Sequence, residues 1–165
     1  MISRLLALLV IPVIAFGVAA CGGEEMGPYK TWTTTFVDPA LDSTLAESKR
    51  TQDQLKAGIP PDEIADDLLV RLQEPQDLWM AAYDASKDLP YRSAGCERMQ
   101  SLTLEMSKAY VLVRTAAVMT SANPAVGQVE ILKAMANVAD TLETLKAATT
   151  VCVDDLTEYV KTASD

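Results

Sequence analysis

The fold is decided by residues 93–124, which read SAGCERMQSLTLEMSKAYVLVRTAAVMTSANP. Apolar and small residues recur there at alternating spacings of three and four, the period of a helix that buries one stripe in a bundle. Ser93 is a good N-cap residue and marks the start. We therefore expect a long helix from 93 to 121, whose buried stripe consists of Cys96, Met99, Thr103, Met106, Tyr110, Val113 and Ala117.

A second long helix follows at once. Asn123 and Pro124 combine an N-cap residue with a proline at the first helical position. The same alternation then runs to the C-terminus and predicts two antiparallel helices joined by a tight turn. The expected stripe consists of Ile131, Met135, Val138, Leu142, Leu145, Thr149, Cys152, Leu156 and Tyr159.

Two shorter helical segments precede this hairpin. Asp38-Pro39 and the closing Gly58 predict a helix over 39–57, and Pro60-Pro61 opens a second segment over 61–88. Pro75 makes that second segment either one kinked helix or two short ones. The chain is thus expected to be all-α, an antiparallel bundle of about four helices over 39–165 with a long C-terminal hairpin. The helix over 39–57 has a thin apolar stripe: Leu41, Leu45 and Leu55.

Residues 21–38 are expected to be a tether and an extended arm. The tether is rich in glycine, and the arm, YKTWTTTFV from Tyr29, is rich in aromatic and β-branched residues that favour extended backbone. The spacing of Tyr29, Trp32 and Phe36 also allows the arm to begin a helix. Its rings are expected to pack on the bundle, and the alternative for Trp32 is a place in the membrane interface.

Residues 1–20 read as an export signal, with Arg4 before a run of aliphatic residues too short to span a bilayer comfortably. The ending Val18-Ala19-Ala20-Cys21 resembles the lipobox of bacterial lipoprotein precursors. The resemblance implies cleavage before Cys21, a diacylglyceryl thioether on its sulfur and acylation, for example by palmitate, of its new amine. The mature protein would then be anchored by acyl chains to the bacterial cell membrane or the outer membrane. The alternatives are an uncleaved anchor helix and an ordinary secretory signal.

Composition excludes several classes of function. The formal net charge is −9, which argues against nucleic acid as a partner, and there is no histidine. Ser-His and Cys-His nucleophile pairs and histidine metal sites are therefore absent. No phosphate-binding loop or calcium-binding spacing is present either. We expect no enzymatic activity, no cofactor and no metal.

Cys96 and Cys152 are expected to form a disulfide. Both lie on the predicted stripes and are equally distant from Pro124, so each would lie roughly 42 Å along its helix, opposite the other. Disulfides persist in exported proteins, because the compartments outside the cytoplasm are oxidising. The disulfide would join the open end of the hairpin.

Two acidic clusters are candidate partner contacts, although acids at a helix start also complement its dipole. They consist of Asp62, Glu63, Asp66 and Asp67, and of Asp154, Asp155 and Glu158.

The candidate ligand pocket is apolar and aromatic, and core packing is the alternative role for its methionine and rings. It consists of Trp79, Tyr83, Met106 and Tyr110.

The expected function is a non-enzymatic binding or scaffolding role toward another envelope component, a protein that the sequence does not identify. The alternative is a bundle that binds a small molecule or lipid. Exposure of Leu41, Leu45 and Leu55 would indicate a partner groove, whereas a cavity within the bundle would favour a ligand.

Overall fold

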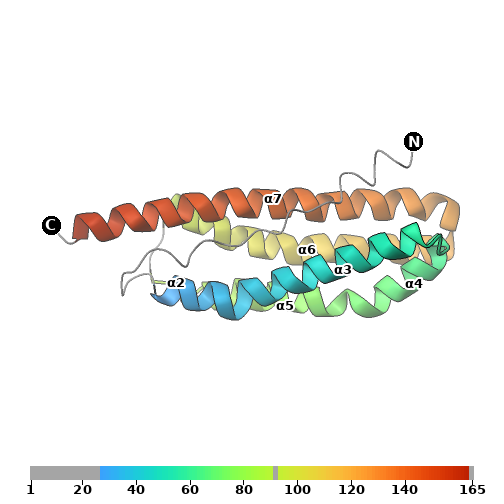
Figure 1. Ribbon diagram of the computed structural model, residues 1–165, viewed down its shortest axis with the longest axis horizontal. Helices are drawn as coiled ribbons and strands as arrows, with labels where there is room; N and C mark the ends of the chain where they lie inside the picture. The colour runs from blue at the N-terminus through green and yellow to red at the C-terminus, as the bar shows by residue number, and fades with distance from the viewer. Residues whose placement is uncertain (1–26, 91–92, 164–165) are drawn as a thin grey trace.

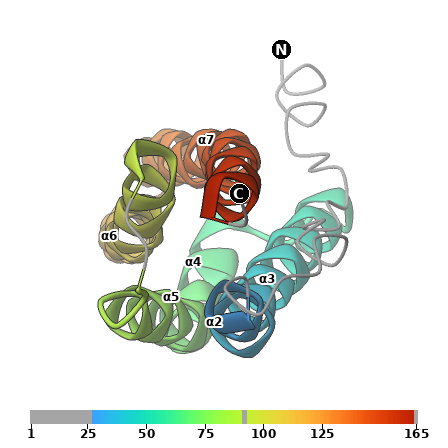
Figure 2. The same cartoon turned by 90° about the vertical axis from the view of Figure 1, so that its left-hand side faces the viewer.

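The computed structural model describes residues 27–90 and 93–163. Four helical columns form an elongated antiparallel bundle, and the described residues contain no strand (Figures 1 and 2). This confirms the expected fold class. The elements are α2 (Gly27–Trp32), η4 (Thr33–Val37), α3 (Asp38–Lys56), α4 (Pro61–Arg71), α5 (Gln73–Ser86), α6 (Ala94–Ala122) and α7 (Pro124–Ala163).

The α6–α7 hairpin forms as its apolar period predicts. Ser93 caps α6, because its Oγ accepts a hydrogen bond of 3.1 Å from the backbone N–H of Cys96. Every residue of the expected α6 stripe is buried. At the turn, Gly127 packs against the backbone of Thr120 so closely that a Cβ there would overlap it. A glycine at this position therefore allows the two helices to meet tightly.

A disulfide joins Cys96 of α6 to Cys152 of α7, as predicted. The two residues are 56 apart in sequence and both are buried, at 0% and 1% exposure. The bond lies near the start of α6, far from the turn, so it links the open end of the hairpin.

The extended arm predicted before residue 38 is wrong over its described part. Residues 27–37 are helical and run directly into α3, so the alternative, a helix that begins in the arm, is the one observed. Asp38 is accordingly not an N-cap, since the helix passes through Pro39. Proline lacks an N–H and crowds the preceding turn, and the five-residue π turn of η4 just before it accommodates both effects.

Burial explains why this segment is helical despite its β-branched composition. Tyr29, Trp32 and Val37 are at most 3% exposed and belong to the core. Trp32 Nε1 donates a hydrogen bond of 2.7 Å to the carbonyl of Ala82 in α5. Trp32 is therefore a core residue, and the proposed position in a membrane interface is wrong. Its ring fixes α2 against α5.

The segment over 61–88 is two helices that meet at Leu72. Leu72 is both the C-cap of α4 and the N-cap of α5, and Pro75 lies within the first turn of α5. Because Pro75 has no N–H to donate, the helical ladder is interrupted near this point. The chain thus makes the second column from two short, nearly continuous helices.

The structure decides the condition set for the leucines of 39–57 and corrects one position of the α7 stripe. Leu41 is buried, while Leu45 and Leu55 are partly buried against the core, so these leucines do not form an exposed groove. Tyr159, expected on the buried stripe of α7, is 42% exposed. Counting back from the Cys96–Cys152 pair, Tyr159 lies beyond the start of α6, so α6 provides no surface to cover it.

Within residues 27–90 and 93–163, none of the helices combines the length and the apolar character needed to cross a bilayer.

Candidate functional site

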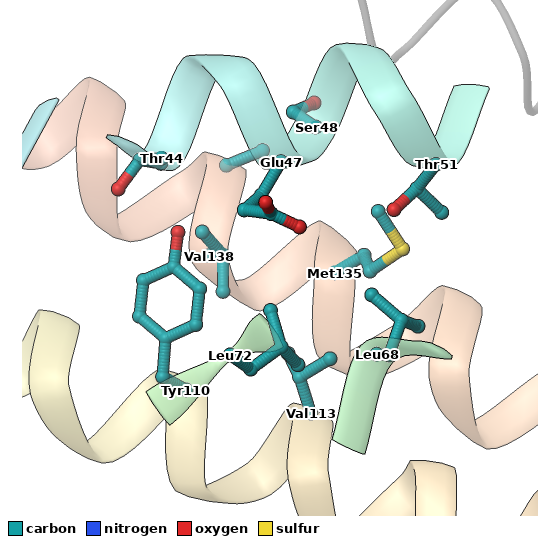
Figure 3. A pocket seen from close by; sticks show the side chains of 11 residues that line it. Thr44, Glu47, Ser48, Thr51, Leu68, Leu72, Tyr110, Val113, Met135 and Val138 are labelled. Atoms are coloured by element: carbon teal, nitrogen blue, oxygen red, sulfur yellow. The ribbon is translucent and has the colours of Figure 1, made fainter. Parts of the chain in front are cut away.

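A small cavity lies between α3 and α7, closed on its inner side by α4 and α6. Figure 3 shows its wall, with hydroxyl and carboxylate groups of α3 above an apolar surface from the other three helices. A second, smaller cavity continues along the same pair of helices toward Leu55 and Ile131. The first cavity is lined by Thr44, Glu47, Ser48, Thr51, Leu68, Leu72, Tyr110, Val113, Met135, Val138 and Ala139.

One end of the cavity is a hydrogen-bonded cluster around Thr44. Its hydroxyl donates to the carbonyl of Ala40 at 2.8 Å and accepts from Trp79 Nε1 at 2.9 Å. The phenol of Tyr110 points toward the same hydroxyl (Figure 3). Burial raises the pKa of Tyr110, and the hydrogen bond with Thr44 opposes this shift. Tyr110 is therefore a neutral hydrogen-bonding group at physiological pH.

The middle of the cavity contains the carboxylate of Glu47, which forms an ion pair with Arg71 of α4. Arg71 also pairs with Asp67 at 2.8 Å, and Gln54 of α3 donates to Asp67 at 2.6 Å. Burial lowers the pKa of Arg71. These groups form a polar network that joins α3 to α4, and only the Glu47 end of it reaches the cavity.

The far end of the cavity presents hydroxyl groups. Thr51 is 1% exposed, and its Oγ1 has no hydrogen-bond partner among the described residues. Other buried threonines of this chain, such as Thr44 and Thr120, donate to the carbonyl four residues back. The Thr51 hydroxyl instead lies where the two cavities meet.

The size of these cavities limits what they can hold. Their volumes are about 30 Å³ and about 20 Å³. A single water molecule needs on the order of 10–15 Å³, whereas drug-sized ligands occupy pockets of roughly 300–1,000 Å³. The cleft as it stands accommodates water and excludes a metabolite or an acyl chain.

The four residues expected to form a ligand pocket do not line one cavity. Trp79 and Met106 are fully buried in the core, and Tyr83 is half-buried beside the ammonium of Lys87. Only Tyr110 of the four contributes to the cavity wall. The sequence missed Glu47 and Thr51, because polar residues on a helix normally face solvent.

The two predicted acidic clusters lie near opposite ends of the bundle, at the start of α4 and toward the end of α7 (Figure 1). Asp66 accepts a hydrogen bond of 2.6 Å from Ser121, and Asp155 accepts one of 3.3 Å from the N–H of Gly95. With Asp67 in the Arg71 network, these three have structural partners. The other four, Asp62, Glu63, Asp154 and Glu158, lie toward the surface and do not form one shared face.

The least expected surface is on the outside of α6. The five exposed positions between residues 111 and 119 carry no charge, and the four apolar ones are 46–55% exposed. The sequence signal for it is that apolar residues flank the buried stripe on both sides, which leaves this part of α6 apolar nearly all round. We call this surface the α6 outer face; it consists of Val111, Leu112, Thr115, Val118 and Met119.

An exposed side chain of α4 extends the α6 outer face. Val70 of α4 is 80% exposed. Val70 lies between two hydrogen bonds that join the column of α4 and α5 to α6, each 2.6 Å long. Ser121 of α6 donates to Asp66 of α4, and Arg114 of α6 donates to Gln73 of α5. Val70 therefore borders this face on the side of α4 and α5.

Cys21, the predicted lipidation site, lies outside the described residues, as do the signal segment 1–20 and the first part of the tether. Among the residues that are described, no group of three or more cysteine and acidic side chains is placed to hold a metal ion.

No protein-family model, curated protein or solved structure matches this chain.

Proposed function

We propose that this protein is an exported lipoprotein, anchored to the bacterial envelope through acyl groups on Cys21. In this proposal its helical bundle binds or scaffolds another envelope component and catalyses no reaction. The support for the anchor is the Val18-Ala19-Ala20-Cys21 ending of the aliphatic leader. Two or more acyl chains hold a protein stably at a bilayer, whereas one chain gives only marginal binding.

The observation that carries the binding role is the contrast between the inside and the outside of the bundle. The two cavities between α3 and α7 are water-sized, whereas the α6 outer face exposes four large apolar side chains. Exposed apolar groups that lie together, in place of scattered single residues, are typical of a surface that binds a macromolecule. The formal charge of −9 keeps the rest of the chain soluble and away from anionic lipid headgroups.

A second candidate function, binding of a small molecule or lipid, is favoured by one observation. The Thr51 hydroxyl is buried without a described partner at the junction of the two cavities. A ligand there would have to part α3 from α7 and would accept or donate a hydrogen bond at Thr51. Native mass spectrometry of the protein extracted from membranes tests this, because a retained ligand adds a fixed mass that is lost in Thr51→Val.

The binding role is tested by site-specific photo-cross-linking in intact envelopes. A photoreactive residue replaces Leu112 on the α6 outer face, and a matched one replaces Val151, a half-exposed residue on α7. We expect a discrete adduct with an envelope protein from position 112 and none of the same mass from position 151. Identical patterns from both positions, or no adduct from either, would contradict binding through this face.

The acidic clusters offer a second mechanism for the same role. If a basic partner binds them, association should slow as salt shortens the Debye length from about 10 Å toward 3 Å. Charge reversal at Asp62 and Glu63, or at Asp154 and Glu158, should show which end is used. Binding that does not respond to salt would remove the acidic ends from the mechanism.

A further inference from the structure

We propose that the α6 outer face is the contact between two copies of this chain, which pair with their α6 helices antiparallel about a two-fold axis at Thr115. The inference deepens the proposed binding role, on which it rests, by naming a second copy as the occupant of this face. It needs no ligand and no change in the described fold.

The face is set apart from the remainder of the same helix by its lack of charge. Toward the N-terminus, the outward positions of α6 are polar or charged, among them Glu97, Arg98 and Glu105. From Val111 to Met119 the fully exposed side chains are all uncharged. Arg114, which is partly exposed at the edge of this face, donates to Gln73 and Gln76 of α5. A helix that is apolar all round is normally covered on both faces, and here the described residues cover only one. The uncovered part is therefore where a partner helix would fit.

The apolar residues of this face are arranged symmetrically about Thr115. Val111 and Leu112 precede it by one helical turn, and Val118 and Met119 follow it by one turn. In an antiparallel pair centred on Thr115, Leu112 of one copy meets Met119 of the other. Val111 meets Val118 on the opposite side of the axis. Such self-complementarity is what a two-fold interface between identical chains requires.

Charges at the ends of the face complement one another in the same arrangement. Lys108 lies one turn before Val111, is exposed, and forms no salt bridge with a described residue. At the other end, Ser121 Oγ donates a hydrogen bond of 2.6 Å to the carboxylate of Asp66. Antiparallel pairing brings Lys108 of one copy to the level of Ala122, next to Asp66, in the other copy. Each copy would thus place a cation near an anion of its partner.

Cysteine cross-linking of the full-length protein in envelopes tests the geometry. Thr115→Cys places a thiol on the two-fold axis, so oxidation should give a covalent dimer linked through position 115 of both chains. The matched control is Thr144→Cys on the outer face of α7. Thr144 is likewise exposed, and the hydroxyls of both threonines donate to the carbonyl four residues back, at 2.9 Å for Thr115 and 2.8 Å for Thr144.

A charge within the interface should weaken pairing without affecting the fold. Val118 and Val151 are 55% and 50% exposed, so a glutamate at either position can reach solvent in a single copy. We expect Val118→Glu to weaken self-association of the detergent-extracted protein by about tenfold or more, since it buries a charge in an apolar contact. Val151→Glu should leave it unchanged. Thermal melting checks that both variants fold as the wild type does.

The outcomes separate this inference from the proposed function. A dimer from Thr115→Cys but not from Thr144→Cys, lost in the additional presence of Val118→Glu, supports pairing of two copies. A monomeric protein whose position 112 cross-links to a different envelope protein overturns the pairing and leaves the proposed binding role intact. Equal dimer yields from both cysteine variants also overturn it, because they would indicate random collision.

Discussion

Trp79 Nε1 donates a hydrogen bond of 2.9 Å to Thr44 Oγ1, which joins α5 to α3 in the centre of the bundle. Both residues are at most 1% exposed. The same hydroxyl donates to the carbonyl of Ala40 and is bonded to the phenol of Tyr110. One threonine therefore satisfies polar groups from three helices in the buried core, which makes it a sensitive position for stability.

Replacement of Thr44 by valine should destabilise the protein although the shape of the side chain is kept. The change leaves the indole N–H of Trp79 buried without an acceptor, which costs about 1–3 kcal/mol in the free energy of unfolding. Urea denaturation should show a lower midpoint with the same slope. Thr144→Val, at an exposed position of α7, should change stability by less than about 0.5 kcal/mol. Equal effects of the two substitutions would contradict the role of the cluster.

Loss of the disulfide should lower stability more than any single hydrogen bond does. The bridge closes a loop of 56 residues, and the chain-entropy estimate for such a loop is about 4 kcal/mol, an upper figure because helix persists in the unfolded chain. The double variant Cys96→Ala/Cys152→Ala should therefore unfold at a lower temperature and a lower urea concentration. Wild-type protein under reducing conditions should show the same shift. Two alkylatable thiols in protein isolated under acid quench would show that the bridge is absent.

The ion pair of Glu47 and Arg71 should matter more than the exposed pairs. Their side chains are 18% and 11% exposed, so Arg71→Met leaves a mostly buried carboxylate without its cation. We expect a loss of about 1–3 kcal/mol in unfolding free energy. Lys133→Met, which breaks the exposed pair with Glu130, should cost less than about 1 kcal/mol. A double-mutant cycle with Glu47→Leu should show that removal of both partners is less harmful than removal of Arg71 alone.

Alkaline pH should destabilise the fold through Tyr110. Its pKa is raised in the folded protein, whereas an unfolded tyrosine ionises at about 10. Below that pH the phenol is protonated in both states and stability is unaffected. Above it the unfolded chain loses the proton first, so the free energy of unfolding falls as pH rises. Urea titrations between pH 8 and about 11 should show a shallower fall for Tyr110→Phe than for Tyr83→Phe. Identical slopes would contradict the burial of this phenol.

The sequence predicted the parts of the fold that follow from helical periodicity. The stripe from Cys96 to Ala117 keeps one helical period throughout and begins at a single N-cap. The spacing of its residues therefore predicts which positions of α6 and α7 face each other, and with them the disulfide. Local and tertiary preferences agree in this hairpin, which is why the inference succeeds.

The start of the bundle could not be predicted in this way, because local preference and packing disagree there. The run from Tyr29 to Val37 favours extended backbone by composition, yet its aromatic rings find a buried place only when the segment is helical. The Thr33 and Thr34 hydroxyls assist by donating to helical carbonyls four residues back, at 2.9 Å each. Tertiary contacts that decide such a segment are not visible in its own sequence.

The candidate sites were harder to predict than the fold, for a related reason. Glu47 and Thr51 look like solvent-facing residues of an amphipathic helix until α7 is placed beside them. The pairing of Asp66 with Ser121 likewise depends on the contact of α4 with α6. The α6 outer face could be predicted from the sequence, because the apolar residues Val111 and Leu112 directly precede the stripe residue Val113.

The claim that the bundle acts from a lipid anchor is tested most directly by the intact mass of the protein extracted from membranes. The lipobox resemblance predicts a chain that begins at Cys21 and carries a diacylglyceryl group on its sulfur, with or without a further acyl group on its amine. Cys21→Ala should abolish this species and leave the precursor uncleaved or the protein released. A wild-type chain that is cleaved elsewhere, carries no acyl group and is found free of the membrane would contradict the claim.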